Sequence, residues 1–191
     1  MNTINREQWL AACAAHLRAR YADAGYTLPE FRLSVGWPSR NALSSRNRTI
    51  GQCWPASTCA DGVPQVFISP ALSDATRVAD VLAHECGHVI LPRAGHRSAF
   101  KRCVESIGLV GKPTATVGSS QFNDWIRDAV IPDIGDYPHA QIDATSGKRQ
   151  STRLIKCQCG ECGYTARTTR QWLIAQGAPL CPCNQHPMQV K

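Results

Sequence analysis

Three histidines and one glutamate lie close together in the stretch LAHECGHVILPRAGH, residues 82–96. His84, Glu85 and His88 fit the pattern H-E-x-x-H, and residues four apart on a helix lie about one turn apart on the same face. Both imidazoles can therefore reach one zinc ion, while Glu85 is placed to deprotonate a zinc-bound water. The pattern favours a catalytic zinc site with Glu85 as the general base.

A catalytic zinc needs a third protein ligand and one open position. His96 is the first candidate, since it follows a PRAG turn that lets the next helix fold back towards the metal. His139 and, more remotely, His16 are the alternatives. Tyr137 or His139 is a candidate for assisting the oxyanion of a substrate. The competing interpretation is an ordinary buried helix, whose polar side chains would then need buried partners.

Five of the ten cysteines are crowded into residues 157–183, where a C-x-x-C pair is followed, 18 residues later, by a C-x-C pair. Two cysteine pairs on tight turns, separated by a segment long enough for a hairpin, indicate a zinc ribbon whose folding energy comes from the metal. The predicted ligands of this structural zinc are Cys159, Cys162, Cys181 and Cys183. Cys157 and His186 lie close enough to replace one of them.

The positive charge of the chain is concentrated at its C-terminal end. The formal net charge is +7, and residues 148–191 contain seven basic residues against a single acidic one. Such a patch favours polyanions such as DNA, and the alternative is a solvated surface that aids solubility. The predicted nucleic-acid-binding residues are Lys156, Arg167 and Arg170. Tyr164 and Trp172 could stack on bases, although Trp172 is more simply interpreted as a core residue of the ribbon.

The elements expected around these motifs belong to an α+β fold. Residues 1–25 predict an amphipathic helix that ends near Gly25, and residues 75–90 predict the helix that carries H-E-x-x-H. Short strands are predicted near residues 31–37, 49–54 and 63–69, and further helices near residues 96–107 and 120–130. Three short strands with close turns indicate a small, mostly antiparallel sheet.

The domain organisation follows from a change in composition. Residues 143–152, DATSGKRQST, are small and polar and predict a linker between a domain over 1–142 and a ribbon over 153–191. The chain contains no apolar run long enough for a transmembrane helix, and charged residues interrupt any signal-peptide core at its start. We therefore expect a cytoplasmic protein without membrane association.

The order of these features resembles the SprT-like zinc metallopeptidases, a broad group that includes the Spartan-type proteases acting on DNA–protein crosslinks. The matching motifs are HECGH at 84–88, HRSAF at 96–100 and the cysteine module at 157–183, together with the strand-rich region before the helix. GDYPHA and CGYTARTTRQW are similar to stretches in phage and actinobacterial versions. The chain departs from better-known members in its short link between His88 and His96 and in Arg97, where those usually have glycine.

The resemblance implies a zincin-like catalytic domain in which His84, His88 and His96 bind the catalytic zinc and Glu85 is the general base. It implies hydrolysis of peptide bonds in DNA-associated proteins, with the basic ribbon bringing the enzyme to DNA. The alternative is a non-enzymatic nucleic-acid-binding protein in which both zincs are structural. That alternative leaves the glutamate beside His84 without a role.

Overall fold

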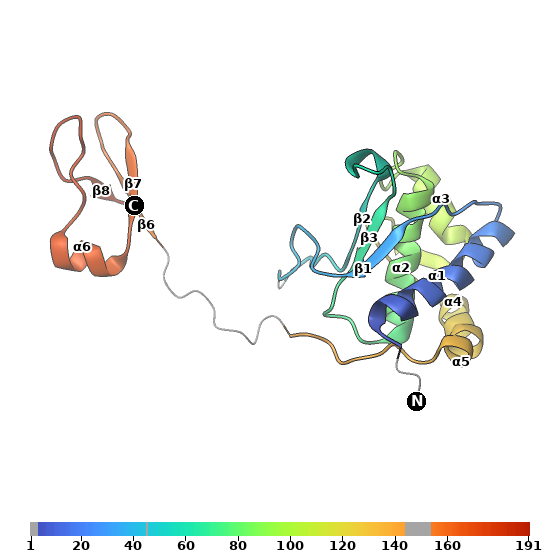
Figure 1. The fold of residues 1–191 in the computed structure, drawn as a ribbon. Coiled ribbons are helices and arrows are strands. Elements are labelled where there is room, and N and C mark those ends of the chain that lie inside the picture. Colours follow the sequence, from blue (N-terminus) through green and yellow to red (C-terminus); the bar gives the residue numbers. More distant parts are fainter. Residues whose placement is uncertain (1–3, 45, 144–153) are drawn as a thin grey trace. The chain divides into compact units, whose positions relative to one another are not determined.

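The structure is a computed structural model of the 191-residue chain, and it describes residues 4–44, 46–143 and 154–191. The chain divides into two compact units, Met1–Ala144 and Thr145–Lys191 (Figure 1). Apart from Asp143, the predicted linker lies outside the described residues. Within the described ranges, every helix is too short or too polar to cross a membrane.

The first unit opens with helix α1 (Arg6–Asp23), as predicted. The Asn5 side chain accepts a hydrogen bond from the Gln8 backbone, and the Gln8 side chain accepts one from the Asn5 backbone. This capping box satisfies two backbone donors that a helix start would otherwise leave unpaired. One face of the helix is fully buried and carries the large side chains of Trp9, Leu17 and Tyr21, which anchor it to the core.

Three strands form the main sheet: β1 (Arg32–Val35), β2 (Gly51–Trp54) and β3 (Gln65–Ile68). Their spatial order is β1-β3-β2, with β2 antiparallel and β1 parallel to β3. The expectation of a mostly antiparallel sheet is therefore wrong for β1. After β1 the chain crosses to the far edge, and β3 then inserts between the two earlier strands, which places it parallel to β1. A short 3-10 turn, η1 (Ala56–Thr58), follows β2.

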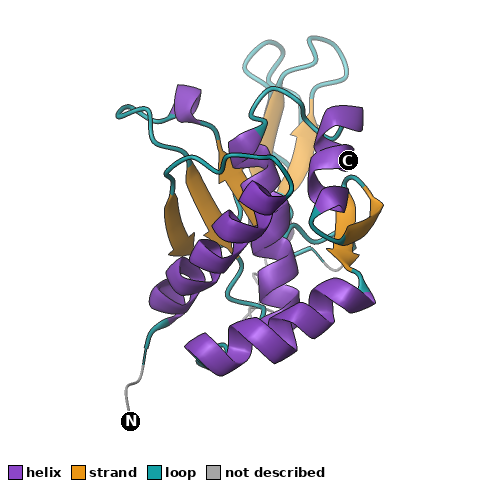
Figure 2. Ribbon diagram, turned by 90° about the vertical axis from the view of Figure 1, so that its right-hand side faces the viewer, coloured by secondary structure: helices purple, strands orange, loops and turns teal. Residues whose placement is uncertain are grey.

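The central helix α2 (Ala75–Ile90) packs against the sheet and carries the H-E-x-x-H motif. Its N-terminus is capped by Asp74, whose side chain accepts the backbone N–H of Arg77. Val78, Leu82 and Cys86 are fully buried in the core of the unit, as the helical spacing predicts. Figure 2 shows that the helices gather on one side of the three strands.

After α2, helix α3 (Ser98–Ser106) leads into a hairpin of β4 (Leu109–Lys112) and β5 (Ala115–Gly118). This hairpin was not predicted from the sequence. Its sequence, LVGKPTATVG, has short alternating runs on either side of Pro113 and Thr114, which form the turn. The hairpin is tied to α2 by Asp80, which accepts the Gly118 backbone N–H and pairs with Arg77 at 2.6 Å.

The last helical segment of the unit continues further than predicted. Helix α4 (Ser120–Trp125) passes through a π-helical turn, η2 (Ile126–Val130), into α5 (Ile131–Ile134). Pro132 does not end the segment, because it sits at the start of α5, where proline is tolerated. The segment ends at Gly135, whose φ of 84° is one that glycine adopts without strain.

The second unit contains strands β6 (Ile155–Gln158), β7 (Thr165–Thr168) and β8 (Gln189–Val190), in the order β7-β6-β8 and all antiparallel. Helix α6 (Arg170–Gln176), which was not predicted, follows β7. Among the described residues of this unit, those that are buried are Cys157, Cys159, Cys181 and Met188. Three of these four are cysteines, so the unit has almost no apolar core of its own.

Candidate metal centres

The three predicted histidine ligands are brought together in the first unit. His84 and His88 come from successive turns of α2, and His96 comes from the turn before α3. The Nε2 atom of His96 lies 3.1 Å from Nε2 of His88 and 3.3 Å from Nε2 of His84. A short link therefore suffices to bring the third imidazole to the first two.

These distances suit a tetrahedral metal ion. Two nitrogens, each about 2.0–2.1 Å from one zinc ion in a tetrahedral arrangement, lie about 3.3 Å apart. Burial lowers the pKa of His84 to about 3 and that of His88 to about 4, with neighbouring histidines adding to the effect. Both imidazoles are thus neutral at pH 7, which is the form that binds metal. The residues present fit a zinc ion with three nitrogen ligands.

Phe100 on α3 supports the histidine cluster from the side. Its ring stacks on His88 with the centroids 4.2 Å apart and meets His84 edge-on at 4.9 Å. Gly87 allows this approach, because a Cβ at that position would lie 2.7 Å from Val104 and 3.0 Å from Phe100. The glycine inside HECGH is thereby explained by the close packing of α3 on α2.

Thr116 on β5 holds the ring of His84 from behind. Its hydroxyl oxygen lies 2.8 Å from Nδ1 of His84, and the residue is buried. If His84 binds metal through Nε2, a neutral imidazole carries its proton on Nδ1 and donates it to this hydroxyl. Thr116 was not predicted from the sequence. It becomes a partner of His84 only because the hairpin lies beside α2, and the hairpin itself was not predicted.

Glu85 lies buried between α2 and the edge strand β2. Burial raises the pKa of its carboxyl to about 8, although a backbone hydrogen bond from Cys53 acts in the opposite direction. Space for the carboxylate depends on Gly51, since a Cβ there would lie 2.5 Å from Oε1 of Glu85. The backbone N–H of Cys53 and the missing side chain of Gly51, both on β2, therefore determine the position of the Glu85 carboxylate.

The histidines and Glu85 line a groove of about 630 Å³. One wall is the edge strand β2 with the residues before it, and the opposite wall is formed by residues 114–116 of the hairpin. Arg48 brings positive charge to the groove, while Arg77, which also lines it, is paired with Asp80. The cluster is therefore open to a ligand of considerable size.

The alternative ligands named from the sequence lie elsewhere. His16 pairs with Asp133 at 2.9 Å, and His139 is exposed, with a φ of 69°. Neither belongs to a candidate metal cluster among the described residues. Tyr137 is buried against Trp9 and does not line the groove, so neither Tyr137 nor His139 is placed to assist an oxyanion there.

The second candidate centre lies in the second unit and is formed by four cysteines. Its members are Cys159, Cys162, Cys181 and Cys183, whose Sγ atoms lie within 4.8 Å of one another. Three of the Sγ–Sγ distances are 3.3, 3.5 and 3.8 Å. Sulfurs at about 2.3 Å from a tetrahedral zinc would lie about 3.8 Å apart, so the donor set fits this ion. The proposed substitutes are outside the cluster, with Cys157 in the small core and His186 exposed.

Each cysteine pair lies on a tight turn. In the first, backbone N–H groups of Cys162 and Glu161 point at the sulfur of Cys159 and lower the pKa of this thiol to about 6. In the second, the Gln185 N–H donates to the Cys181 carbonyl at 2.8 Å, and Gln185 adopts a φ of 57°. Amides directed at a sulfur stabilise its thiolate form, which is the form that binds metal.

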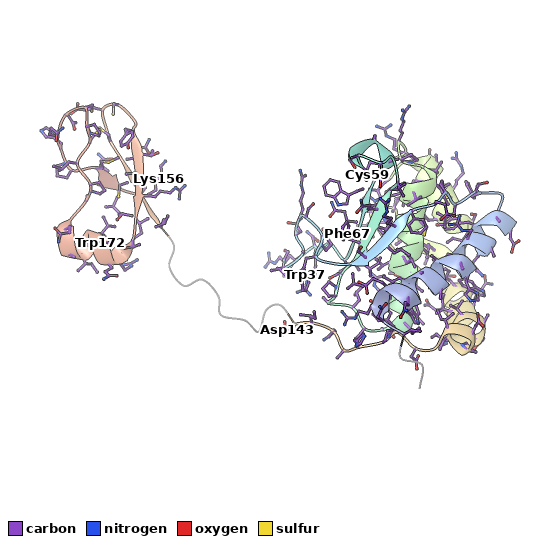
Figure 3. All side chains as sticks on the ribbon, viewed as in Figure 1. Trp37, Cys59, Phe67, Asp143, Lys156 and Trp172 are labelled. Carbon is purple, nitrogen blue, oxygen red and sulfur yellow. The ribbon has the colours of Figure 1, made fainter. Side chains whose placement is uncertain are left out.

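The predicted nucleic-acid-binding residues lie on the surface of the second unit. Lys156 and Arg167 face each other across β6 and β7 and so share one face, while Arg170 begins α6. Trp172 is labelled on α6 in Figure 3 and is 57% exposed, so its interpretation as a core residue is wrong.

Comparison with known proteins adds no relative to this description. No protein-family model, no curated protein and no solved structure matches the chain.

Proposed function

We propose that the protein is a zinc-dependent endopeptidase of the SprT-like type that acts on proteins associated with DNA. The observation that carries the proposal is the convergence of the three Nε2 atoms of His84, His88 and His96 in a groove that also contains Glu85. A structural site would be closed by a fourth protein ligand, whereas a catalytic zinc needs three ligands and access for substrate.

A zinc ion held by three imidazoles supplies a water molecule of lowered pKa and a Lewis acid for the substrate carbonyl. Glu85 follows His84 directly and is held against β2. A zinc ion beside it would favour its ionised form, so its carboxylate could take a proton without being a ligand. It can then return that proton to the leaving amine of a cleaved peptide. Thr116 keeps the His84 ring in orientation throughout.

The groove supports a peptide as the substrate. β2 is an edge strand, and one of its sides faces β3 while the other faces the groove. An extended peptide can add to such an edge through main-chain hydrogen bonds, largely independently of its sequence. This suits an endopeptidase with a broad choice of protein substrates.

Association with DNA is supported by the charge of the second unit. Lys156 and Arg167 form a cationic pair on one face of a small ribbon whose cysteine cluster fits a structural zinc. Such a module binds phosphate backbones through positive charge. It would concentrate the peptidase where DNA-bound proteins lie.

The test compares the zinc-loaded protein with its Glu85→Gln variant on a basic DNA-binding protein, with and without DNA. We expect cleavage by the wild type, faster with DNA, and at least a hundredfold loss in the variant at unchanged zinc content. Two zinc-loaded proteins that are equally inactive would instead support a non-enzymatic nucleic-acid-binding protein.

A further inference from the structure

The outer face of the three-stranded sheet carries no ligand of either candidate metal centre. Because side chains alternate along a strand, the residues between the core-facing ones point away from α2. Across the sheet they form two rows, and we call these six residues the outer sheet face: Arg32, Gln65 and Trp54, then Ser34, Phe67 and Gln52. In Figure 1 helices α1 and α2 lie on the other side of the strands.

Aromatic rings are exposed on and beside this face. Trp54 is 39% exposed, and Trp37, which follows β1, is 38% exposed. Phe67 is partly exposed and is not among the side chains that pack on the core. Figure 3 labels Trp37 and Phe67 on the strand side of the first unit. Rings that remain accessible in this way offer flat apolar surfaces on which unpaired bases can stack.

The connection from β1 to β2 adds positive charge without any acidic group. Between residues 31 and 60 the sequence contains four arginines and no aspartate or glutamate. One of them, Arg32, is paired with Asp61. The other three are exposed: Arg40, Arg46 and Arg48. Among the described residues, no acidic side chain forms an ion pair with these three.

The connection is fastened to the outer sheet face. The Ser39 backbone N–H donates to the Gln52 side chain at 2.8 Å, and the Gln52 amide donates back to the Ser39 hydroxyl at 2.9 Å. The Asn41 carbonyl accepts the N–H of Ser44 at 3.1 Å and that of Thr49 at 3.4 Å. The arginines therefore belong to a connection that hydrogen bonds hold beside the aromatic rings.

We propose that the outer sheet face and these three arginines together bind single-stranded nucleic acid. Arginines without acidic partners match phosphates, and accessible rings match unpaired bases, whose faces a duplex would hide. The inference rests on the proposed function, in which protein substrates bound to DNA enter the groove. Arg48 connects the two surfaces, because it also lines this groove. A strand bound here would run along the rim of the groove that receives the protein substrate.

The test measures binding of a fluorescent oligothymidylate by anisotropy, using the full chain with Glu85→Gln so that cleavage plays no part. In the triple variant Arg40→Ala/Arg46→Ala/Arg48→Ala we expect weaker binding and a smaller dependence on salt. Three lost phosphate contacts at about 0.7 each lower the slope of log K against log salt by about 2. Arg102→Ala on α3 is the matched control and should leave the slope unchanged.

A second pair of variants separates stacking from charge. Trp37→Ala and Trp54→Ala should each weaken binding by about fivefold or more while the slope stays at the parental value. Lys156→Ala/Arg167→Ala should lower affinity in addition to the loop variants, because these two residues belong to the other unit.

The proposal is overturned if the folded triple variant binds with parental affinity and slope. It is also overturned if polyglutamate displaces the oligonucleotide as efficiently as unlabelled oligothymidylate, which would assign the surface to acidic proteins. Neither result bears on the proposed peptidase activity, which is tested by cleavage. Conversely, an inactive wild type would remove the proposed function and leave this binding result standing.

Discussion

The histidine cluster of the first unit stands on a helix whose opposite face is packed into an apolar core, whereas cysteines make up most of the small core of the second unit. Trp9, Leu82 and Phe100 are completely buried in the first unit. In the second, Met188 is the only buried residue other than cysteine among those described.

Under the proposed function, this difference separates two uses of zinc. A unit with its own core can hold three ligands ready and leave a groove open beside them, because its stability does not depend on a fourth. A unit without a core needs all its ligands to close the site, since the binding free energy of the metal is its folding free energy. The comparison predicts opposite responses to removal of zinc.

Removal of zinc has the largest expected effect. Structural zinc in such small modules contributes on the order of 10 kcal/mol, so a chelator should unfold the second unit and leave the first folded. Hydrogen exchange read by mass spectrometry should show lost protection in β6 and β7 and retained protection in α1 and α2. Equal loss in both units would contradict the comparison.

Glu85→Gln should stabilise the metal-free first unit at alkaline pH. The pKa of Glu85 is raised from 4.5 in the unfolded chain to about 8 in the folded protein, so the folded protein holds this proton more tightly. The resulting contribution to the free energy of unfolding is fully present below pH 4.5 and is lost as the pH rises through 8. Above that pH the neutral amide avoids a cost on the order of 4 kcal/mol. Urea unfolding at pH 5 and pH 9 measures the free energy of unfolding of both proteins. An equal gain in the variant at both pH values would show that ionisation of Glu85 is not the cause.

Gly51→Ala should damage activity without removing zinc. The new Cβ would lie 2.5 Å from Oε1 of Glu85 and must displace it, and a shift of about 1 Å in a catalytic group costs roughly a hundredfold in rate. Gly36→Ala is the matched control, because its Cβ would meet only the Phe67 ring. Peptidase rate and zinc content are measured together, and full activity of Gly51→Ala would show that Glu85 is not held there.

Thr116→Val should have the smallest effect, a roughly tenfold loss of zinc affinity in the first unit. The valine keeps the shape of threonine but removes the hydroxyl 2.8 Å from Nδ1 of His84. Competition with a chromophoric chelator measures the affinity. Thr116→Ser should restore it, and Thr114→Val, at the same wall of the groove, should leave it unchanged.

Much of this arrangement follows from local sequence. The helix carrying His84 and His88 could be predicted because its core-facing residues recur at helical spacing, and the four cysteines because their spacing suits two tight turns. The pairing of β1 with β3 could not, because strand order depends on contacts between distant segments. The same holds for Thr116 and Gly51, whose roles exist only once a hairpin and an edge strand lie against α2.

The central claim is that one zinc site is open and the other closed, and X-ray absorption at the zinc edge tests it most directly. The measurement uses two variants of the full chain, His84→Ala/His88→Ala and Cys159→Ser/Cys181→Ser, each loaded with zinc. The histidine variant should retain one zinc with four sulfur ligands. The cysteine variant should retain one zinc with three imidazole ligands and one oxygen from solvent. A histidine site that binds no zinc, or that shows a fourth protein ligand, would contradict the account.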